Sequence, residues 1–166
     1  MDELEIKKIL TKCLKNSGVK FLGVFPSDHI PCTNDILAHT PVCYVVNSDP
    51  CSEPGTHWVA FFHPSATHVE FFDSFGKPPS HYHLFVPSNL VLTHNHVKLQ
   101  SDTTESCGKR GIIFLHRRAQ GSSLSSFTRT IGSLSIKNSE NFARSYFSKF
   151  SSTCEFNKNN NSRKFI

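Results

Sequence analysis

Apolar residues recur along this chain first at the spacing of a helix and then at the spacing of strands. Residues 2–16 carry an apolar side chain at about every third or fourth position, and a polar stretch ending in glycine follows, so a helix is predicted there. Residues 41–47 are a short apolar run rich in β-branched residues, which is typical of a buried strand. Residues 47–56 contain many turn formers and predict a loop.

The clearest local pattern lies in two β-rich runs, 57–62 and 68–73, which predict a hairpin. With residues 63–67 as its loop, residue 61 pairs with 69, 59 with 71 and 57 with 73. One face of the hairpin is then apolar and carries Val59, Phe61, Val69 and Phe71. The same register places His57 opposite Asp73, so the sequence favours a His–Asp pair on adjacent strands.

Weaker patterns complete the expected layout. Residues 21–26 are expected to be an ordered loop, and residues 90–92 a further strand. Residues 139–150 predict a helix, and the polar, Asn-rich residues 151–166 are expected to form a loose tail.

Residues 106–118 also predict a helix, with Ser106 as a candidate N-cap. One face of this helix carries Gly108, Gly111, Ile112 and Leu115, and its two glycines allow close packing against a sheet. The expected fold is α+β, in a single domain of residues 1–150. In it, a central mixed sheet that contains the His–Asp hairpin packs against the helix that begins at Cys107.

Composition narrows the class of protein. The 166 residues are 37% hydrophobic and 19% charged, with a net charge of +5, which excludes a wholly disordered chain. No apolar run approaches the length of a membrane span, and the charged start has no apolar region typical of a signal peptide. The six cysteines are therefore interpreted as thiols in a reducing compartment. The mild positive charge permits a nucleic-acid partner without requiring one.

Cys107 falls in the first turn of the helix predicted for 106–118, where backbone N–H groups and the helix dipole stabilise a thiolate. A carboxylate such as Asp73 can fix the tautomer of His57 and stabilise its charged form. A cysteine, a base and an orienting acid are the parts of a thiol hydrolase. The spacing alone leaves open whether Cys107 reaches His57.

These residues resemble the motifs of the adenovirus-protease-like (adenain-like) cysteine proteases, which are related to the ubiquitin-like-protein (SUMO-type) proteases. The copies carried by Maverick/Polinton-type DNA transposons look most similar. The resemblance runs from about residue 21 to residue 121. Its motifs are Phe21-Leu22-Gly23-Val24-Phe25, Gly55-Thr56-His57-Trp58-Val59-Ala60-Phe61, Phe72-Asp73-Ser74-Phe75-Gly76, and Gln100 followed after six residues by Cys107-Gly108.

The resemblance implies that Cys107 is the nucleophile, His57 the general base and Asp73 its orienting acid. Gln100 would supply an amide N–H to the oxyanion hole. The implied activity is a thiol endopeptidase that matures virus- or transposon-encoded structural precursors. The alternatives are an isopeptidase that acts on SUMO- or ubiquitin-like tails, and an inactive copy that binds protein or DNA.

The resemblance also implies a polypeptide substrate, with a Gly-rich cleavage site as one candidate, and a monomeric enzyme. No cofactor is required, although DNA or an activating peptide is a candidate accessory. The expected location is the nucleus or cytoplasm of a eukaryotic host, or a virus-like particle.

Two features leave other interpretations open. Lys109, Arg110 and Gly111 follow Cys107-Gly108, where the family often has apolar or aromatic residues. These two cations could depress the pKa of the thiol further, or they could mark an inactive copy.

A zinc module is another interpretation of the sequence, but the chain has no ligand pairs at the usual C-x₂-C or H-x₃-H spacing. The potential ligands are Cys43, Cys51, His63, His81, His83, His94 and His96.

Overall fold

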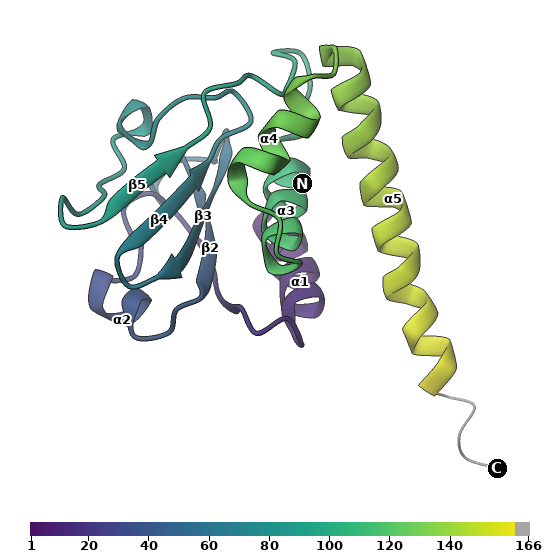
Figure 1. Ribbon diagram of the computed structural model, residues 1–166, viewed down its shortest axis with the longest axis horizontal. Coiled ribbons are helices and arrows are strands. Elements are labelled where there is room, and N and C mark those ends of the chain that lie inside the picture. The colour runs from purple at the N-terminus through teal and green to yellow at the C-terminus, as the bar shows by residue number, and fades with distance from the viewer. Residues whose placement is uncertain (162–166) are drawn as a thin grey trace.

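The computed structural model describes the backbone of residues 1–161 and the side chains of residues 1–148. It has a five-stranded sheet in the order β1-β2-β3-β4-β5 (Figure 1). The outer pairs β1–β2 and β4–β5 are parallel, and the inner pairs β2–β3 and β3–β4 are antiparallel. The strands are Lys20–Phe25, Val42–Asn47, Trp58–Ser65, His68–Phe72 and Val91–His94. The predicted α+β class with a mixed sheet is confirmed.

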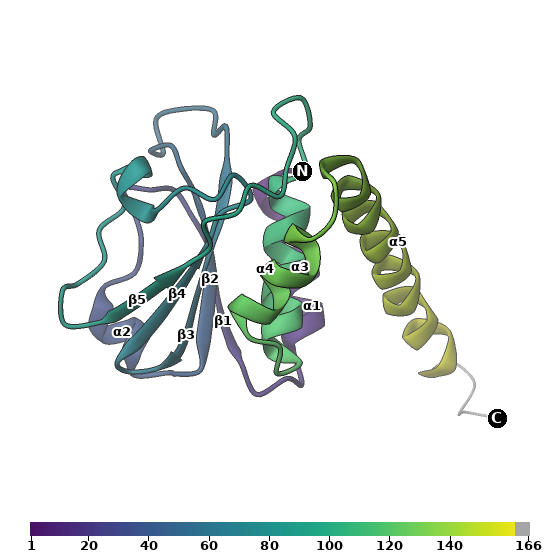
Figure 2. The same cartoon turned by 45° about the horizontal axis from the view of Figure 1, so that its top comes forward.

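Helices cover one face of this sheet in two layers (Figures 1 and 2). Helices α1, α3 and α4 lie next to the sheet, and α5 runs along their outer side. The bounds are α1 Glu3–Leu14, α2 Thr33–Leu37, a 3-10 turn η1 Pro79–Tyr82, α3 Cys107–Ala119, α4 Leu124–Gly132 and α5 Ile136–Asn161. None of the described helices combines the length and the hydrophobicity needed to cross a bilayer.

Two of the secondary-structure predictions were wrong. The stretch 21–26, expected to be a loop, lies mostly in strand β1, because it pairs in parallel with the buried strand β2 and so gains a hydrogen-bonded partner that local sequence does not reveal. Residues 151–161, expected to be a loose tail, continue α5. Residues 162–166 of that predicted tail lie outside the described residues.

The hairpin has a different register from the predicted one. Ala60 pairs with Phe72 and Phe61 with Phe71, two residues away from the prediction. The cause is that β3 continues through Pro64 to Ser65 with an irregularity in the pairing, so the turn is much shorter than the predicted loop 63–67. Because side chains alternate with a period of two, a shift of two residues keeps the same side chains on the same face.

The core therefore divides by strand face as the alternation predicts. Val59, Phe61, Val69 and Phe71 share the cluster on the α2 side of the sheet. On the other face, Phe72 stacks on Phe114 of α3, with ring centroids 4.8 Å apart. This contact anchors α3, the helix that begins at Cys107, to the sheet.

The two glycines on the sheet side of α3 differ in the space around them. A Cβ at Gly111 would lie 3.8 Å from the Cβ of Ala60, an ordinary contact. A Cβ at Gly108 would lie 3.2 to 3.3 Å from side-chain atoms of Met1, Ile6 and Trp58. Close packing of the helix therefore depends on Gly108 more than on Gly111.

We expect Gly111→Ala to raise the free energy of unfolding by about 0.5–1 kcal/mol, because alanine loses less backbone entropy in a helix. Gly108→Ala should give a smaller gain or a loss, since its methyl group presses on three neighbours. Urea denaturation of both variants measures the difference. Equal gains at the two positions would show that Gly108 is not closely packed.

Candidate active site

His57 and Asp73 meet at one end of the β3–β4 hairpin. His57 directly precedes β3 and Asp73 directly follows β4. The Nε2 atom of His57 lies 2.6 Å from Oδ1 of Asp73, and the carboxylate is fully buried. A buried carboxylate at this distance fixes the orientation of the imidazole ring. The two side chains are in contact despite the register difference, because both leave the hairpin at the same end.

A ring of donors surrounds the Asp73 carboxylate. Oδ1 accepts a hydrogen bond from the backbone N–H of Phe75 at 3.2 Å. Oδ2 accepts from the backbone N–H of Lys77 at 2.8 Å and from the hydroxyl of Tyr82 at 3.0 Å. The Asn95 side chain bonds both the N–H and the C=O of the Asp73 backbone. These bonds stabilise a charge that burial alone would oppose.

Aromatic rings enclose the imidazole. The ring centroid of His57 lies 4.9 Å from that of Phe75 and 5.5 Å from that of Tyr82. The neighbouring indole of Trp58 donates a hydrogen bond from Nε1 to the backbone oxygen of Met1 at 3.2 Å. His57 is 7% exposed and Cys107 is 8% exposed, so solvent and small molecules have only narrow access to the pair.

Cys107 is the first residue of α3, and the neighbouring His57 side chain lowers the pKa of its thiol. Because Nε2 of that ring is hydrogen-bonded to Asp73, Nδ1 is the ring nitrogen left to interact with the thiol. The backbone N–H groups of Trp58 and Gly108 also stabilise the sulfur as a thiolate. Cys107, His57 and Asp73 thus form one chain of interacting side chains, in which His57 is hydrogen-bonded to Asp73 and influences the pKa of the Cys107 thiol.

The pKa values within this chain move in opposite directions. Burial raises the pKa of the Cys107 thiol, but the hydrogen bond to His57 and the nearby backbone donors outweigh it, so the pKa is lowered. Burial also disfavours a charged His57, yet its bonds to Asp73 and Cys107 raise the His57 pKa to about 9. For Asp73, burial is again opposed by His57 and backbone donors, and the pKa falls. A thiolate–imidazolium pair is the form that these shifts favour.

The shifts predict how the reactivity of Cys107 depends on pH. The thiolate should persist as pH falls until its lowered pKa is reached, and the imidazolium should persist as pH rises until about 9. We therefore expect the rate of alkylation by iodoacetamide to be high at pH 7 and to plateau below pH 9. In His57→Ala the pH at which the alkylation rate is half-maximal should rise, because burial then raises the pKa of the thiol without the opposing effect of the imidazolium. Identical profiles for the two proteins would contradict the ion pair.

Gln100 lies in the loop that leads to α3, and its side chain is 2% exposed. Its Oε1 accepts a hydrogen bond from Oγ of Ser74 at 2.7 Å, and its Nε2 donates to the backbone oxygen of Thr104. The backbone N–H groups of Leu99 and Gln100 both donate to the backbone oxygen of Ser74. Ser74, the residue after Asp73, therefore holds the Gln100 loop next to the end of β4.

The two cationic side chains after Cys107-Gly108, those of Lys109 and Arg110, contact helix α5. Arg110 is 2% exposed, and its Nη2 lies 3.0 Å from Oε1 of Glu140 on α5. The Nζ of Lys109 lies 5.6 Å from the ring centroid of Phe147, also on α5. Both side chains have partners on α5, and Arg110 is a buried part of the structure.

Three residues of this site were not predicted from the sequence to take part in it. Tyr82 and Asn95 fall in residues 81–98, where the hydrophobic pattern is weak, and they reach Asp73 through η1 and the segment after β5. Ser74 follows Asp73 directly, which is the one cue that could have found it. Each was missed because its contact is made across the fold.

One group of residues could hold a metal ion within the described part of the chain. The donor atoms of Asp28, His29 and Cys51 lie within 4.8 Å of one another, and all three residues are exposed. Of the potential zinc ligands named from the sequence, only Cys51 belongs to this group. The others lie apart from it, with Cys43 buried in strand β2 and His63 buried in strand β3.

No protein-family model matches the chain, and comparison with curated proteins finds no matching relative.

Proposed function

We propose that this chain is a cysteine peptidase in which Cys107, His57 and Asp73 act as nucleophile, general base and orienting acid. The observation that carries the proposal is the His57 ring, which is hydrogen-bonded to a buried carboxylate and lowers the pKa of a thiol at the start of a helix. The lowered thiol pKa and the raised imidazole pKa are what a thiol nucleophile needs at neutral pH.

In the proposed mechanism, the Cys107 thiolate attacks a peptide carbonyl and forms a tetrahedral oxyanion. Gln100 and the backbone N–H of Cys107 are the proposed donors to that oxyanion, and each such donor typically contributes about 10²–10³ in rate. The His57 imidazolium gives its proton to the leaving amine as the C–N bond breaks, which leaves a thioester on Cys107. The neutral His57 then takes a proton from water, which hydrolyses the thioester and releases the acid.

The resemblance to adenovirus-protease-like enzymes gives the proposal its substrate class. The spacing of Gln100 and Cys107 favours an endopeptidase that matures virus- or transposon-encoded structural precursors. An isopeptidase acting on Gly-ending ubiquitin-like tails would use the same residues. The partners of Arg110 and Lys109 on α5 weaken the interpretation of these cations as the mark of an inactive copy, because neither side chain is left to disturb the thiol.

Cleavage profiling tests the proposed function. The wild-type protein and Cys107→Ala are incubated with a peptide library and with a panel of SUMO and ubiquitin fusions. We expect Cys107-dependent cleavage of internal peptide bonds in the library. Cleavage confined to the Gly-ending fusions would favour the isopeptidase, and no cleavage in either set would contradict a peptidase.

A further inference from the structure

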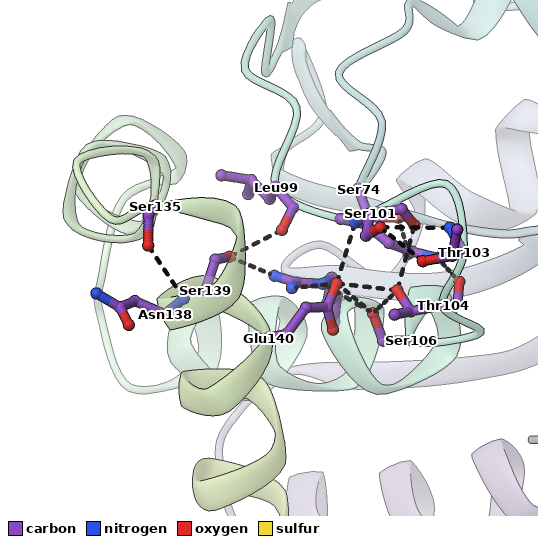
Figure 3. A network of polar contacts seen from close by, with 12 residues as sticks. Ser74, Leu99, Ser101, Thr103, Thr104, Ser106, Ser135, Asn138, Ser139 and Glu140 are labelled. Carbon is purple, nitrogen blue, oxygen red and sulfur yellow. Dashed lines mark hydrogen bonds and ion pairs between the residues drawn. The ribbon is translucent and has the colours of Figure 1, made fainter.

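A polar cluster connects helix α5 to the loop that precedes Cys107. Loop 99–106 carries Gln100 and runs into the first turn of α3, and Ser139 and Glu140 from α5 point toward it (Figure 3). Between them lies the buried guanidinium of Arg110, one turn after Cys107. Arg110 therefore links three parts of the chain that are separate in sequence.

The guanidinium of Arg110 uses each of its nitrogens on a different side chain. Nε donates to Oγ of Ser106 at 3.1 Å, and Nη1 donates to Oγ of Ser139 at 2.9 Å. Nη2 forms the ion pair with Glu140, which is close enough for charge attraction but lacks the angle of a hydrogen bond. The planar fork of arginine suits this arrangement, whereas a lysine ammonium could not reach all three partners at once.

Glu140 in turn binds the loop itself. Its Oε1 accepts hydrogen bonds from the backbone N–H of Ser101 at 3.1 Å and from the hydroxyl of Thr104 at 2.9 Å. Ser139 donates from Oγ to the backbone oxygen of Leu99 at 2.8 Å. The residues on either side of Gln100 are thus bonded to α5, and Thr104 also accepts the hydrogen bond from the Gln100 side chain.

These contacts hold in place the loop that carries Gln100, the proposed oxyanion donor. A loop of this kind pays an entropic cost for being ordered, so its position depends on the partners that fix it. Burial raises the pKa of Glu140, but the Ser101 backbone and Arg110 outweigh it and lower the pKa, which keeps the carboxylate available as an acceptor. Ser106, in the N-cap position of α3, makes no capping bond and joins the cluster instead.

We propose that Arg110, Ser139 and Glu140 are positioning residues that hold loop 99–106, and with it Gln100, in the geometry required for acyl transfer to Cys107. The proposal rests on the proposed function. It assigns α5 a part in the active site, although α5 lies in the outer helical layer and none of its described side chains, up to residue 148, belongs to the Cys107–His57–Asp73 chain.

The test compares two reactions of Cys107 that differ in their need for an oxyanion hole. Acylation by p-nitrophenyl acetate passes through a tetrahedral oxyanion, whereas alkylation by iodoacetamide requires only the thiolate. In Glu140→Ala we expect the acylation rate to fall by about 10²-fold, as a misplaced catalytic group typically does. We expect the alkylation rate and its pH profile to stay within about twofold of the wild type, because His57 and Asp73 are untouched.

Hydrogen exchange gives an independent readout of the loop. The amide of Ser101 should exchange at least about 10-fold faster in Glu140→Ala, since its acceptor is gone. Glu140→Gln keeps an oxygen acceptor for Ser101 and Thr104 and should restore most of the protection and of the acylation rate. Arg144→Ala, on an exposed position one turn further along α5, is the matched control and should change neither.

Each outcome bears on the proposal. Unchanged acylation in Glu140→Ala, or faster exchange without slower acylation, would overturn the positioning role while leaving the proposed function intact. Acylation and alkylation that fall together would also overturn it, because the defect would then be a general loss of structure. Failure of the wild type to be acylated at Cys107 would contradict the proposed function and the positioning role together.

Discussion

Replacing His57 with alanine is expected to lower kcat/KM for peptide hydrolysis by about 10²–10⁴-fold, the usual contribution of a positioned general acid–base. The loss has two sources. The Cys107 thiol no longer has the imidazole that lowers its pKa, and the leaving amine no longer receives a proton from that ring. Steady-state kinetics at pH 7 on the best library substrate measure the effect.

The pH dependence separates these two sources. At a pH above the raised thiol pKa of the variant, the thiolate is restored but the proton donor is still missing. We therefore expect alkylation by iodoacetamide to recover at high pH while peptide hydrolysis does not. Recovery of both reactions would contradict the proposed role of His57 as the acid that protonates the leaving group.

Asp73→Asn is expected to cause the second large loss, in both stability and activity. Both carboxylate oxygens accept hydrogen bonds, from Phe75 and His57 on one side and from Lys77 and Tyr82 on the other. An amide has only one acceptor oxygen, so either orientation leaves one part-buried backbone N–H, that of Phe75 or that of Lys77, without its acceptor. That costs about 1–3 kcal/mol of unfolding free energy.

The activity loss follows from the tautomer of His57. The orientation that keeps the bonds from Lys77 and Tyr82 presents the N–H of the substituted side-chain amide to Nε2 of His57. The ring must then carry its proton on Nδ1, where it can no longer accept the thiol proton, and we expect kcat to fall by about 10²–10⁴-fold. Tyr82→Phe is the matched control, since it removes one donor to Asp73 but leaves the carboxylate, and its loss should be about 10-fold or less. Equal losses in the two variants would contradict this role of the carboxylate.

Local sequence patterns predict the elements of this site better than their connections. Alternation in residues 57–73 predicts the hairpin and the meeting of His57 and Asp73, and helical spacing after Ser106 predicts the helix that begins at Cys107. The register was wrong by two residues because β3 continues through Pro64, a residue that usually ends a strand. The prediction of which side chains share a face was still correct, because a shift by an even number of residues keeps each side chain on the same face.

The connections among these elements depend on contacts that local patterns do not encode. Nothing in the polar sequence around Ser139 and Glu140 indicates that they bind a loop 40 residues earlier. Arg110 had two interpretations from sequence, as an activating charge or as a sign of decay. Its burial and its partners on α5 favour a third, in which the cation is a structural support for the site.

Selective labelling of Cys107 tests the central claim most directly. The chain has six cysteines, among which Cys32 and Cys51 are exposed and serve as internal controls. After brief treatment with a limiting amount of iodoacetamide at pH 7, peptide mass spectrometry locates the adduct. The account predicts modification concentrated on the nearly buried Cys107 in the wild type and lost from it in His57→Ala. Modification that follows exposure, with Cys32 and Cys51 labelled ahead of Cys107 and no effect of His57→Ala, would contradict an activated thiolate and the proposed peptidase with it.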